Sequence, residues 1–235
     1  MKKIRYKGLS TLEILEGANN YNNWIASEIL RYARSPMIEI GSGIGNLSEK
    51  FLSYKPLTLS DSDIGLVKIL QERFADKERV TSLQLDIEKD ISINLKNQFR
   101  SVVAVNVLEH VKDDQRALHN ISALLKRDGT IRLLVPAKQF AYTRLDKELG
   151  HYRRYEKDAL EQKLINAGFI INDIYFFNIV GLVSWIIRDK IEKKNIHLKP
   201  YQIALFDLIV PVLRFIERNI RPPIGISLIV VATKK

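Results

Sequence analysis

The apolar and polar positions predict strands that alternate with helices along most of the chain. Short runs rich in Val, Ile and Leu are bounded by Gly, Pro, Asp or Asn, as is typical of buried strands in a parallel sheet. Such runs occupy residues 37–40, 57–60, 80–85, 101–105, 131–135, 169–177 and 225–233. We therefore expect a parallel sheet that is covered by helices.

Between these runs, apolar residues recur every three or four positions, which predicts amphipathic helices. The predicted helices lie at residues 8–34, 46–52, 63–74, 117–125 and 160–165. The fourth is expected to stop at Gly129 and the fifth at Gly168, since glycine favours helix ends. Residues 138–156 are polar and aromatic and are expected to form a loop.

Residues 179–222 are expected to form two helices inserted before the last strand. The second is apolar over a wide arc and has a predicted kink at Pro211. In one interpretation, the helices bury their faces against each other, the sheet edge or a second subunit. In the other, they dock on a membrane surface or hold a lipid-linked acceptor. The basic residues that accompany them are Arg188, Lys190, Lys193, Lys194, Arg214, Arg218 and Arg221.

Composition and charge narrow the classes of protein. The chain has 235 residues and no cysteine, which fits a reducing compartment such as the cytoplasm and excludes thiolate metal sites. Its four histidines stand far apart in sequence, so we expect no metal site. Its longest apolar stretches are too short to span a bilayer as helices, and no apolar signal core follows the basic N-terminus. The net charge of +10 suits an anionic partner.

The stretch 37–46 carries the clearest chemical signal. Apolar residues and Glu39 run into three alternate glycines that begin at Gly41, which predicts a buried strand, a tight turn and a helix N-terminus. Such a turn binds nucleotide-like ligands in many α/β sheets, although the pattern alone also fits a simple tight turn. Asn46 stands where a dinucleotide fingerprint has its last glycine. Because a buried carboxylate is costly alone, Glu39 needs a partner such as an ammonium group.

Polar side chains also follow the next three strands. Asp61 follows the second strand, Asp86 the third and Asn106 the fourth. Asp61 is well placed to accept hydrogen bonds from both hydroxyls of a ribose. It could instead cap the next helix, but Asp63 is available for that role. In an open α/β sheet, these strand ends line the ligand crevice.

Together these residues resemble the class I S-adenosylmethionine-dependent methyltransferases. The resemblance rests on the turn from Glu39 to Gly45, Asp61, Asp86-Ile87, the stretch from Asn106 to Val111 and Asp128-Gly129. It implies a Rossmann-like fold with a seven-stranded, mostly parallel sheet, helices on both faces, an antiparallel last strand and a helical insertion before it. The single domain would comprise an N-terminal helical cap (1–34), a cofactor-binding core with an acceptor loop (35–178), the insertion (179–222) and a closing strand (223–235).

A bacterial subgroup of this family, associated with glycosyltransferases of cell-surface glycan or polyprenol metabolism, shares further motifs with the chain. These motifs are Tyr21-x-x-Trp24, Leu108-Glu109-His110 and the stretch from Gly150 to Tyr155. The acceptors of this subgroup are mostly undefined. The resemblance therefore says more about the type of reaction than about the acceptor.

The resemblance implies S-adenosylmethionine as the cofactor. The implied cofactor-binding residues are Glu39, Gly41, Ser42, Gly43, Asp61, Asp86, Ile87 and Asn106. The first four would hold the methionine part, and Asn106 would close that side. Asp61 would bind the ribose, whereas Asp86 and Ile87 would contact the adenine.

Methyl transfer requires an aligned acceptor and, for some acceptors, a base. His110 and His151 are the candidate catalytic bases, because histidine titrates near neutral pH. A structural hydrogen bond for His110 and a solvated loop for His151 are the alternatives. The candidate acceptor-binding residues are Tyr21, Trp24, Arg153, Arg154 and Tyr155. The two arginines could bind a phosphate or carboxylate, whereas Tyr21 and Trp24 also fit the packing of a helix.

We therefore expect methyl transfer to an anionic acceptor that is a small molecule or is linked to a lipid or glycan. The enzyme would be a monomer or homodimer, in the cytoplasm or at the inner membrane surface. A nicotinamide-dependent oxidoreductase shares the strand and glycine pattern, but Glu39 and Asn46 argue against it. A non-catalytic protein that keeps this fold and cofactor is a second alternative. Nucleic acid is not the expected acceptor, since the fourth strand is not followed by an Asn-Pro-Pro-Tyr-type motif.

Overall fold

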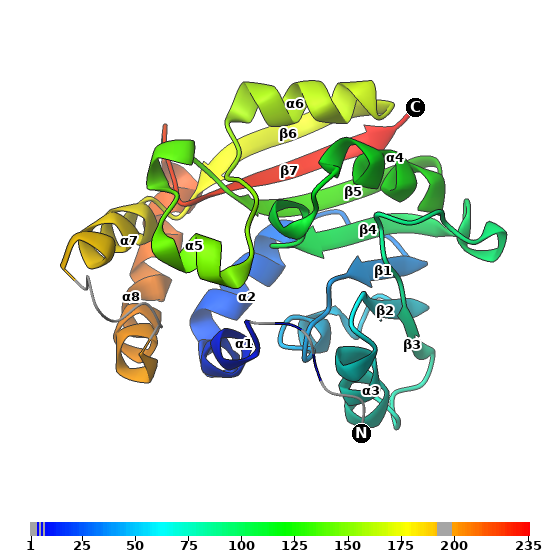
Figure 1. Cartoon of the computed structure of the whole chain (residues 1–235), viewed down its shortest axis with the longest axis horizontal. Helices are drawn as coiled ribbons and strands as arrows, with labels where there is room; N and C mark the ends of the chain where they lie inside the picture. The colour runs from blue at the N-terminus through cyan, green and yellow to red at the C-terminus, as the bar shows by residue number, and fades with distance from the viewer. Residues whose placement is uncertain (1–3, 5, 7, 192–198) are drawn as a thin grey trace.

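Seven strands form one sheet in this computed structural model, which describes residues 4, 6, 8–191 and 199–235. The strands are β1 (Met37–Ile40), β2 (Leu57–Asp61), β3 (Val80–Gln84), β4 (Phe99–Val105), β5 (Leu125–Pro136), β6 (Phe169–Phe177) and β7 (Ser227–Lys234). Their order across the sheet is β3-β2-β1-β4-β5-β7-β6 (Figure 1). Neighbours from β1 to β5 pair in parallel, whereas β7 is antiparallel to β5 and β6. This confirms the expected Rossmann-like α/β sheet with an antiparallel closing strand.

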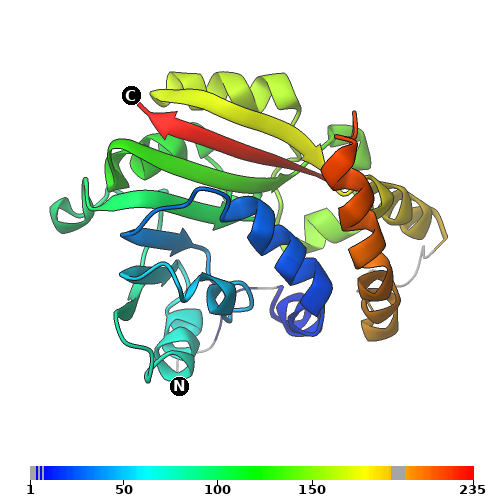
Figure 2. The ribbon, with the colours of Figure 1, turned by 180° about the vertical axis from the view of Figure 1, so that it is seen from behind.

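Helices cover both faces of the sheet, as expected. They are α1 (Leu9–Glu16), α2 (Asn19–Ile29), α3 (Ile64–Arg73), α4 (Asp114–Leu124), α5 (Arg144–Leu149), α6 (Lys157–Asn166), α7 (Ile179–Ile191) and α8 (Pro200–Asn219). Short 3₁₀ helices are η1 (Ser48–Phe51), η2 (Ile93–Leu95), η3 (Leu108–His110) and η4 (Gln139–Ala141). α4 covers one face (Figure 1), whereas α2 and α8 lie on the other (Figure 2).

The core has two halves because successive side chains of a strand point to opposite faces of the sheet. Ile38 and Ile40 of β1 pack in the half that contains α4 and α6. Met37 packs in the other half, together with Trp24 of α2 and Val210 of α8. The buried strands therefore read as continuous apolar runs in the sequence.

Two predicted helices differ in detail from the structure. The glycine turn is followed by the 3₁₀ helix η1 instead of an α-helix over 46–52, because the buried Ser48 hydroxyl donates to Glu39 and ties this segment to β1. α4 ends at Leu124, because Leu125 already pairs with Phe99 of β4. The predicted helix stop at Gly129 therefore lies inside β5.

Other differences concern the second half of the chain. The predicted helix 160–165 lies within α6, where the apolar residue Ile165 is 41% exposed. The predicted loop 138–156 contains η4 and α5. The two inserted helices are confirmed as α7 and α8, although Lys193 and Lys194 lie outside the described residues.

α8 is anchored on α2 by polar contacts as well as by its apolar stripe. The helix continues through Pro211, which has no N–H for the carbonyl of Asp207. The side-chain amide of Asn20 donates to that carbonyl at 3.1 Å. The Asp207 carboxylate also accepts from the backbone N–H groups of Asn20 and Tyr21, at 3.1 and 2.8 Å. None of the helices in the described part of the chain is long and apolar enough to cross a membrane.

Candidate active site

The glycine turn after β1 packs closely against neighbouring elements. Gly41 and Gly43 have φ angles of +70° and +57°, in a region that other residues rarely adopt. A Cβ atom on Gly41 would lie 2.5 Å from Cγ2 of Val107, and one on Gly43 would lie 3.0 Å from Cδ1 of Leu12. The turn therefore requires glycine at both positions. Without side chains there, the backbone groups that follow β1 can contact a ligand directly.

Glu39 is buried next to this turn and is only 3% exposed. Burial raises the pKa of its carboxyl group to about 7, although hydrogen bonds from Ser48 and Ser42 oppose the shift. A carboxyl group that ionises this close to neutrality gains strongly from a nearby cation. This environment fits the predicted contact with an ammonium group.

Asp61 connects the end of β2 to the glycine turn. Its Oδ2 accepts from the backbone N–H of Gly43 at 3.0 Å, and its Oδ1 accepts from that of Asp63 at 2.9 Å. Asp63 caps α3 through the N–H of Gly65, which confirms that Asp61 is not needed as the cap. Burial raises the pKa of Asp61 despite these hydrogen bonds. Each carboxylate oxygen keeps a further lone pair for a ligand hydroxyl.

The parallel register of the sheet places Asp86 and Asn106 at the same end of the strands as Asp61. Gln84, two residues before Asp86, pairs with Asp61. Asp86 is half-buried and forms an ion pair with Lys89 at 3.1 Å. Asn106 follows β4 directly with a φ of +52° and is exposed. Ile87 is only 4% exposed in the core, which leaves little of its surface for an adenine ring.

The two predicted bases, His110 and His151, meet in space. Their ring centroids are 4.6 Å apart in an edge-to-face arrangement. Glu109 joins them, because one ligand atom from each of the three residues lies within 4.8 Å of the others. The three side chains are called the His–Glu cluster below. Their convergence shows that the Leu108–His110 stretch and the loop after α5 contribute to one site.

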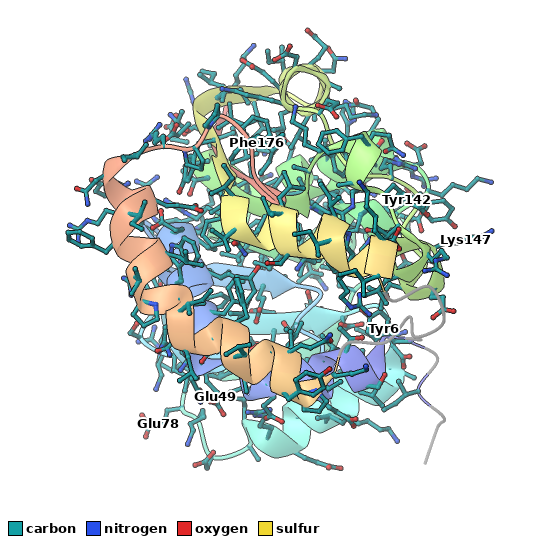
Figure 3. All side chains as sticks on the ribbon, turned by 90° about the vertical axis from the view of Figure 1, so that its left-hand side faces the viewer. Tyr6, Glu49, Glu78, Tyr142, Lys147 and Phe176 are labelled. Carbon is teal, nitrogen blue, oxygen red and sulfur yellow. The ribbon has the colours of Figure 1, made fainter. Side chains whose placement is uncertain are left out.

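The cluster lies in a poorly solvated environment. Burial raises the pKa of Glu109 to about 8. Burial and the neighbouring His151 lower the pKa of His110 to about 4. The Tyr6 ring packs 5.9 Å from that of His110, and the Tyr6 backbone N–H donates to Asp63 (Tyr6 is labelled in Figure 3). Tyr6 therefore lies between the cluster and the Asp61 end of the crevice.

His151 is held in place from several sides. Its Nδ1 lies 2.8 Å from Oδ1 of the buried Asp146, and its carbonyl accepts from the Tyr142 hydroxyl at 2.6 Å. The next residue, Tyr152, donates its backbone N–H to the Glu109 carbonyl at 2.7 Å. Because the Asp146 carboxylate is an acceptor, the neutral imidazole of His151 carries its proton on Nδ1 and its lone pair on Nε2.

The predicted acceptor-binding residues Arg153, Arg154 and Tyr155 already have partners within the fold. Arg154 is buried and forms an ion pair with Asp146 at 3.0 Å, so it holds Asp146 rather than facing a ligand. Tyr155 is 3% exposed, and its hydroxyl donates to Leu108 and Asp114. Arg153 is partly exposed but already pairs with Asp114 at 2.7 Å. An anionic acceptor would have to compete with that carboxylate.

Tyr21 and Trp24 take the packing role that the sequence left open. Trp24 is 2% exposed, and its ring lies 4.3 Å from that of Phe177. Tyr21 packs edge-to-face on Phe206 of α8 at 5.7 Å. The predicted contact of Trp24 with an acceptor does not fit this buried position.

Glu109, Asp146 and Tyr6 are the residues of this site to which the sequence assigned no role, although Glu109 belongs to the Leu108-Glu109-His110 motif. Glu109 is the one acid in the apolar run that follows Asn106. Asp146 is the last residue of a capping box that begins at Thr143. Both signals are present in the sequence, whereas no local pattern marks Tyr6.

The polar groups at the carboxyl ends of the strands fit S-adenosylmethionine. Glu39 would face its ammonium group, the bare backbone after β1 would take its carboxylate side, and Asp61 would accept from its ribose. The turn at Gly41 and Gly43 has no room for side chains, as a site that binds through backbone requires.

Comparison with known proteins supports this assignment. Residues 38–131 match the family model described as a methyltransferase domain. The fumosorinone synthetase of Cordyceps fumosorosea is 27% identical over 131 residues, which cover 50% of this chain and 3% of that protein. The chain thus spans only a small fraction of the length of the curated relatives that it matches, several of which are named polyketide synthases.

Solved structures show the same fold. The CMeT domain of the citrinin polyketide synthase has a TM-score of 0.55 at 14% identity, over 83% of this chain and 45% of that chain. Phosphoethanolamine N-methyltransferase 2 of Haemonchus contortus, solved with S-adenosyl-L-methionine, has a TM-score of 0.59 at 19% identity, over 92% of this chain and 52% of that chain. The chain therefore has the class I methyltransferase fold, residues 38–131 match a methyltransferase domain, and S-adenosylmethionine is the cofactor that this fold and the residues of the site fit.

Proposed function

We propose that the chain transfers a methyl group to a small-molecule or lipid-linked acceptor, whose reacting atom lies beside the His–Glu cluster. The observation that carries this proposal is the convergence of Glu109, His110 and His151 at the end of β4, next to the cofactor crevice. The cofactor supplies an electrophilic methyl group on a sulfonium centre. The residues of this chain bind it, align the acceptor and exclude water.

The His–Glu cluster is suited to contact the reacting atom. Nε2 of His151 and the ring of His110 offer nitrogen lone pairs in a site that burial keeps poorly solvated. The rigid support of His151 by Asp146 favours one orientation of its ring. The predicted role of the two histidines in activating the acceptor is therefore part of the proposal.

A lipid-linked acceptor is supported by the surface of α8. The α8 surface, as defined here, consists of Tyr201, Leu205, Leu208, Val212 and Phe215, which are 61–73% exposed. Monomeric soluble proteins rarely expose so many neighbouring apolar residues, so this surface indicates a partner.

The charges of α8 support the proposal that this partner is an anionic membrane. Its two acids face inward, because Asp207 accepts from the start of α2 and Glu217 accepts from the N–H groups of Asn178 and Ile179. Arg214 and Arg218 are exposed. Apolar and cationic side chains together are typical of helices that bind anionic lipid surfaces. This feature agrees with the resemblance to the subgroup of glycan and polyprenol metabolism, which we retain as part of the proposal.

The proposal is tested by incubating the protein with methyl-labelled S-adenosylmethionine and extracts of small molecules, lipids and glycans, followed by mass spectrometry. We expect a labelled product with the wild type and a strong loss of it with His151→Ala. S-adenosylhomocysteine should still bind His151→Ala with wild-type affinity in calorimetry. Equal labelling by both proteins would contradict the role of the cluster. Full cofactor binding without any labelled product would favour the non-catalytic alternative.

A further inference from the structure

We propose that Glu109, His110 and His151 bind a divalent transition-metal cation such as Zn²⁺, which leaves an open position for an oxygen atom of the acceptor. The inference deepens the proposed function and rests on it for the acceptor, but not for the metal site itself. Within the described residues, this cluster is the one set of three such side chains whose ligand atoms converge.

The first argument is the burial of Glu109 without a partner. Its side chain is 0% exposed, and neither carboxylate oxygen has a hydrogen-bond partner in the described part of the chain. Buried polar atoms are almost always paired, so an orphan indicates a missing water, ion or ligand. One carboxylate oxygen of Glu109 lies within 4.8 Å of a ring nitrogen of each of the two imidazoles. A cation there would satisfy the carboxylate and favour its charged form.

The second argument is the orientation of His151. Its Nδ1 contacts the Asp146 carboxylate, so the lone pair of Nε2 is available on the opposite side of the ring. A histidine that binds metal usually donates its other N–H to a carboxylate or a carbonyl, which fixes the ring and strengthens the ligand. Asp146 is itself fixed by Arg154 at 3.0 Å and by the Thr143 backbone at 2.8 Å. Asp146 and its partners therefore hold His151 in the orientation that a metal ligand requires.

The third argument is how the chain fixes the distance between the ligands. Glu109 and His110 follow β4 on η3, whereas His151 follows α5. The bond from the Tyr152 N–H to the Glu109 carbonyl joins the two segments at 2.7 Å. The Tyr155 hydroxyl adds a second link, to the Leu108 carbonyl at 3.1 Å. Hydrogen bonds within the chain thereby hold two imidazoles and a carboxylate close together.

The ligand set indicates the type of metal and its use. Two imidazoles and one carboxylate suit Zn²⁺ and related first-row cations rather than Mg²⁺ or Ca²⁺, which prefer oxygen ligands. Three protein ligands leave a fourth position open, as in catalytic rather than structural zinc sites. That position would take an oxygen donor of the acceptor, next to the cofactor crevice. The acceptor class that follows is a molecule whose reacting group contains oxygen.

The test is titration of the tag-free, chelator-treated full chain with Co²⁺ and Zn²⁺. We expect about one equivalent of bound metal, visible-range absorption by the Co²⁺ form, and an increase in melting temperature with Zn²⁺. Glu109→Gln, which keeps the size of the side chain, and His151→Ala should each lower metal affinity at least tenfold. The matched control is His119→Ala, because His119 lies on the exposed side of α4 and should leave binding unchanged.

Calorimetry with S-adenosylhomocysteine separates the two proposals. If all proteins bind the nucleoside but the wild type binds no Co²⁺ beyond the level of Glu109→Gln, the metal proposal is wrong and the proposed function stands. If metal binds as predicted but the nucleoside does not, the proposed function is wrong and the metal site stands. Equal Co²⁺ binding by wild type, Glu109→Gln and His151→Ala would place the metal elsewhere and overturn the inference. Circular dichroism verifies that each variant is folded.

Discussion

Asp146 anchors His151: its Oδ1 lies 2.8 Å from Nδ1 of the imidazole, at a position where the carboxylate is fully buried. The same carboxylate pairs with the buried guanidinium of Arg154 and closes the capping box of α5. One acid thus links the orientation of the candidate active-site histidine to the stability of the loop that carries it.

Asp146→Asn should destabilise the protein by about 3–5 kcal/mol, because Arg154 then remains buried without a counter-charge. Urea denaturation measures the change. The matched control is Asp158→Asn, an exposed position on α6, which should change stability by less than about 0.5 kcal/mol. Equal midpoints for the two variants would contradict the assigned role of Asp146.

Gly41→Ala should destabilise the protein more than Gly150→Ala. Both glycines have a positive φ, so both substitutions carry a backbone cost of about 1–2 kcal/mol. A Cβ at Gly41 also meets Val107 at 2.5 Å, whereas a Cβ at Gly150 meets no atom within 4 Å. Urea denaturation measures the free energy of unfolding of both variants, and the difference between them gives the cost of the contact between the added Cβ and Val107. Equal losses of stability would show that the turn can move away from Val107.

Glu39→Gln should remove a pH dependence of stability from the cofactor-free protein. The proton on Glu39 stabilises the folded state fully below about pH 4.5, and this contribution is lost as the pH rises through about 7. The wild type should therefore lose on the order of 3 kcal/mol relative to the variant between these pH values. Urea denaturation of both proteins across this range provides the measurement. A constant difference between them would mean that the pKa of Glu39 is not raised.

Replacement of Leu208 and Phe215 by serine should reduce binding to anionic liposomes, because both side chains belong to the exposed apolar surface of α8. Co-sedimentation at low salt measures the loss, and Ile93→Ser serves as the control at an exposed apolar residue far from α8 in sequence. We expect the control to bind like the wild type. A concentration-dependent dimer that the serine variant disrupts, without liposome binding, would instead identify a second copy of the chain as the partner.

The central strands, such as β1 and β4, could be predicted from the sequence because they are buried on both faces of the sheet. Each strand is then a continuous apolar run, and the polar residue after it marks the exit, as Asp61 and Asn106 do. Propensity did not predict the 3₁₀ helix η1, since the contact from Ser48 to Glu39 decides its form and joins two separate segments.

The candidate site was predicted only in part, for the same reason. His110 and His151 were identified as chemically capable residues, but their contact depends on hydrogen bonds between η3 and the loop after α5. Arg153 and Arg154 were predicted to bind an anion. In the structure, Asp114 pairs with Arg153 and Asp146 pairs with Arg154. A sequence shows which groups a loop offers, whereas partners within the fold determine which of them stay available.

Calorimetric titration with S-adenosylhomocysteine, with NADH as the comparison, is the most direct measurement for the central claim that the strand ends bind S-adenosylmethionine. We expect the nucleoside to bind the wild type and to bind Asp61→Ala about 1.5–3 kcal/mol more weakly, the usual loss for a hydrogen bond to a charged group. Asp76→Ala, at an exposed carboxylate, should bind like the wild type. Binding of NADH but not of S-adenosylhomocysteine, or equal affinity in wild type and Asp61→Ala, would contradict the account.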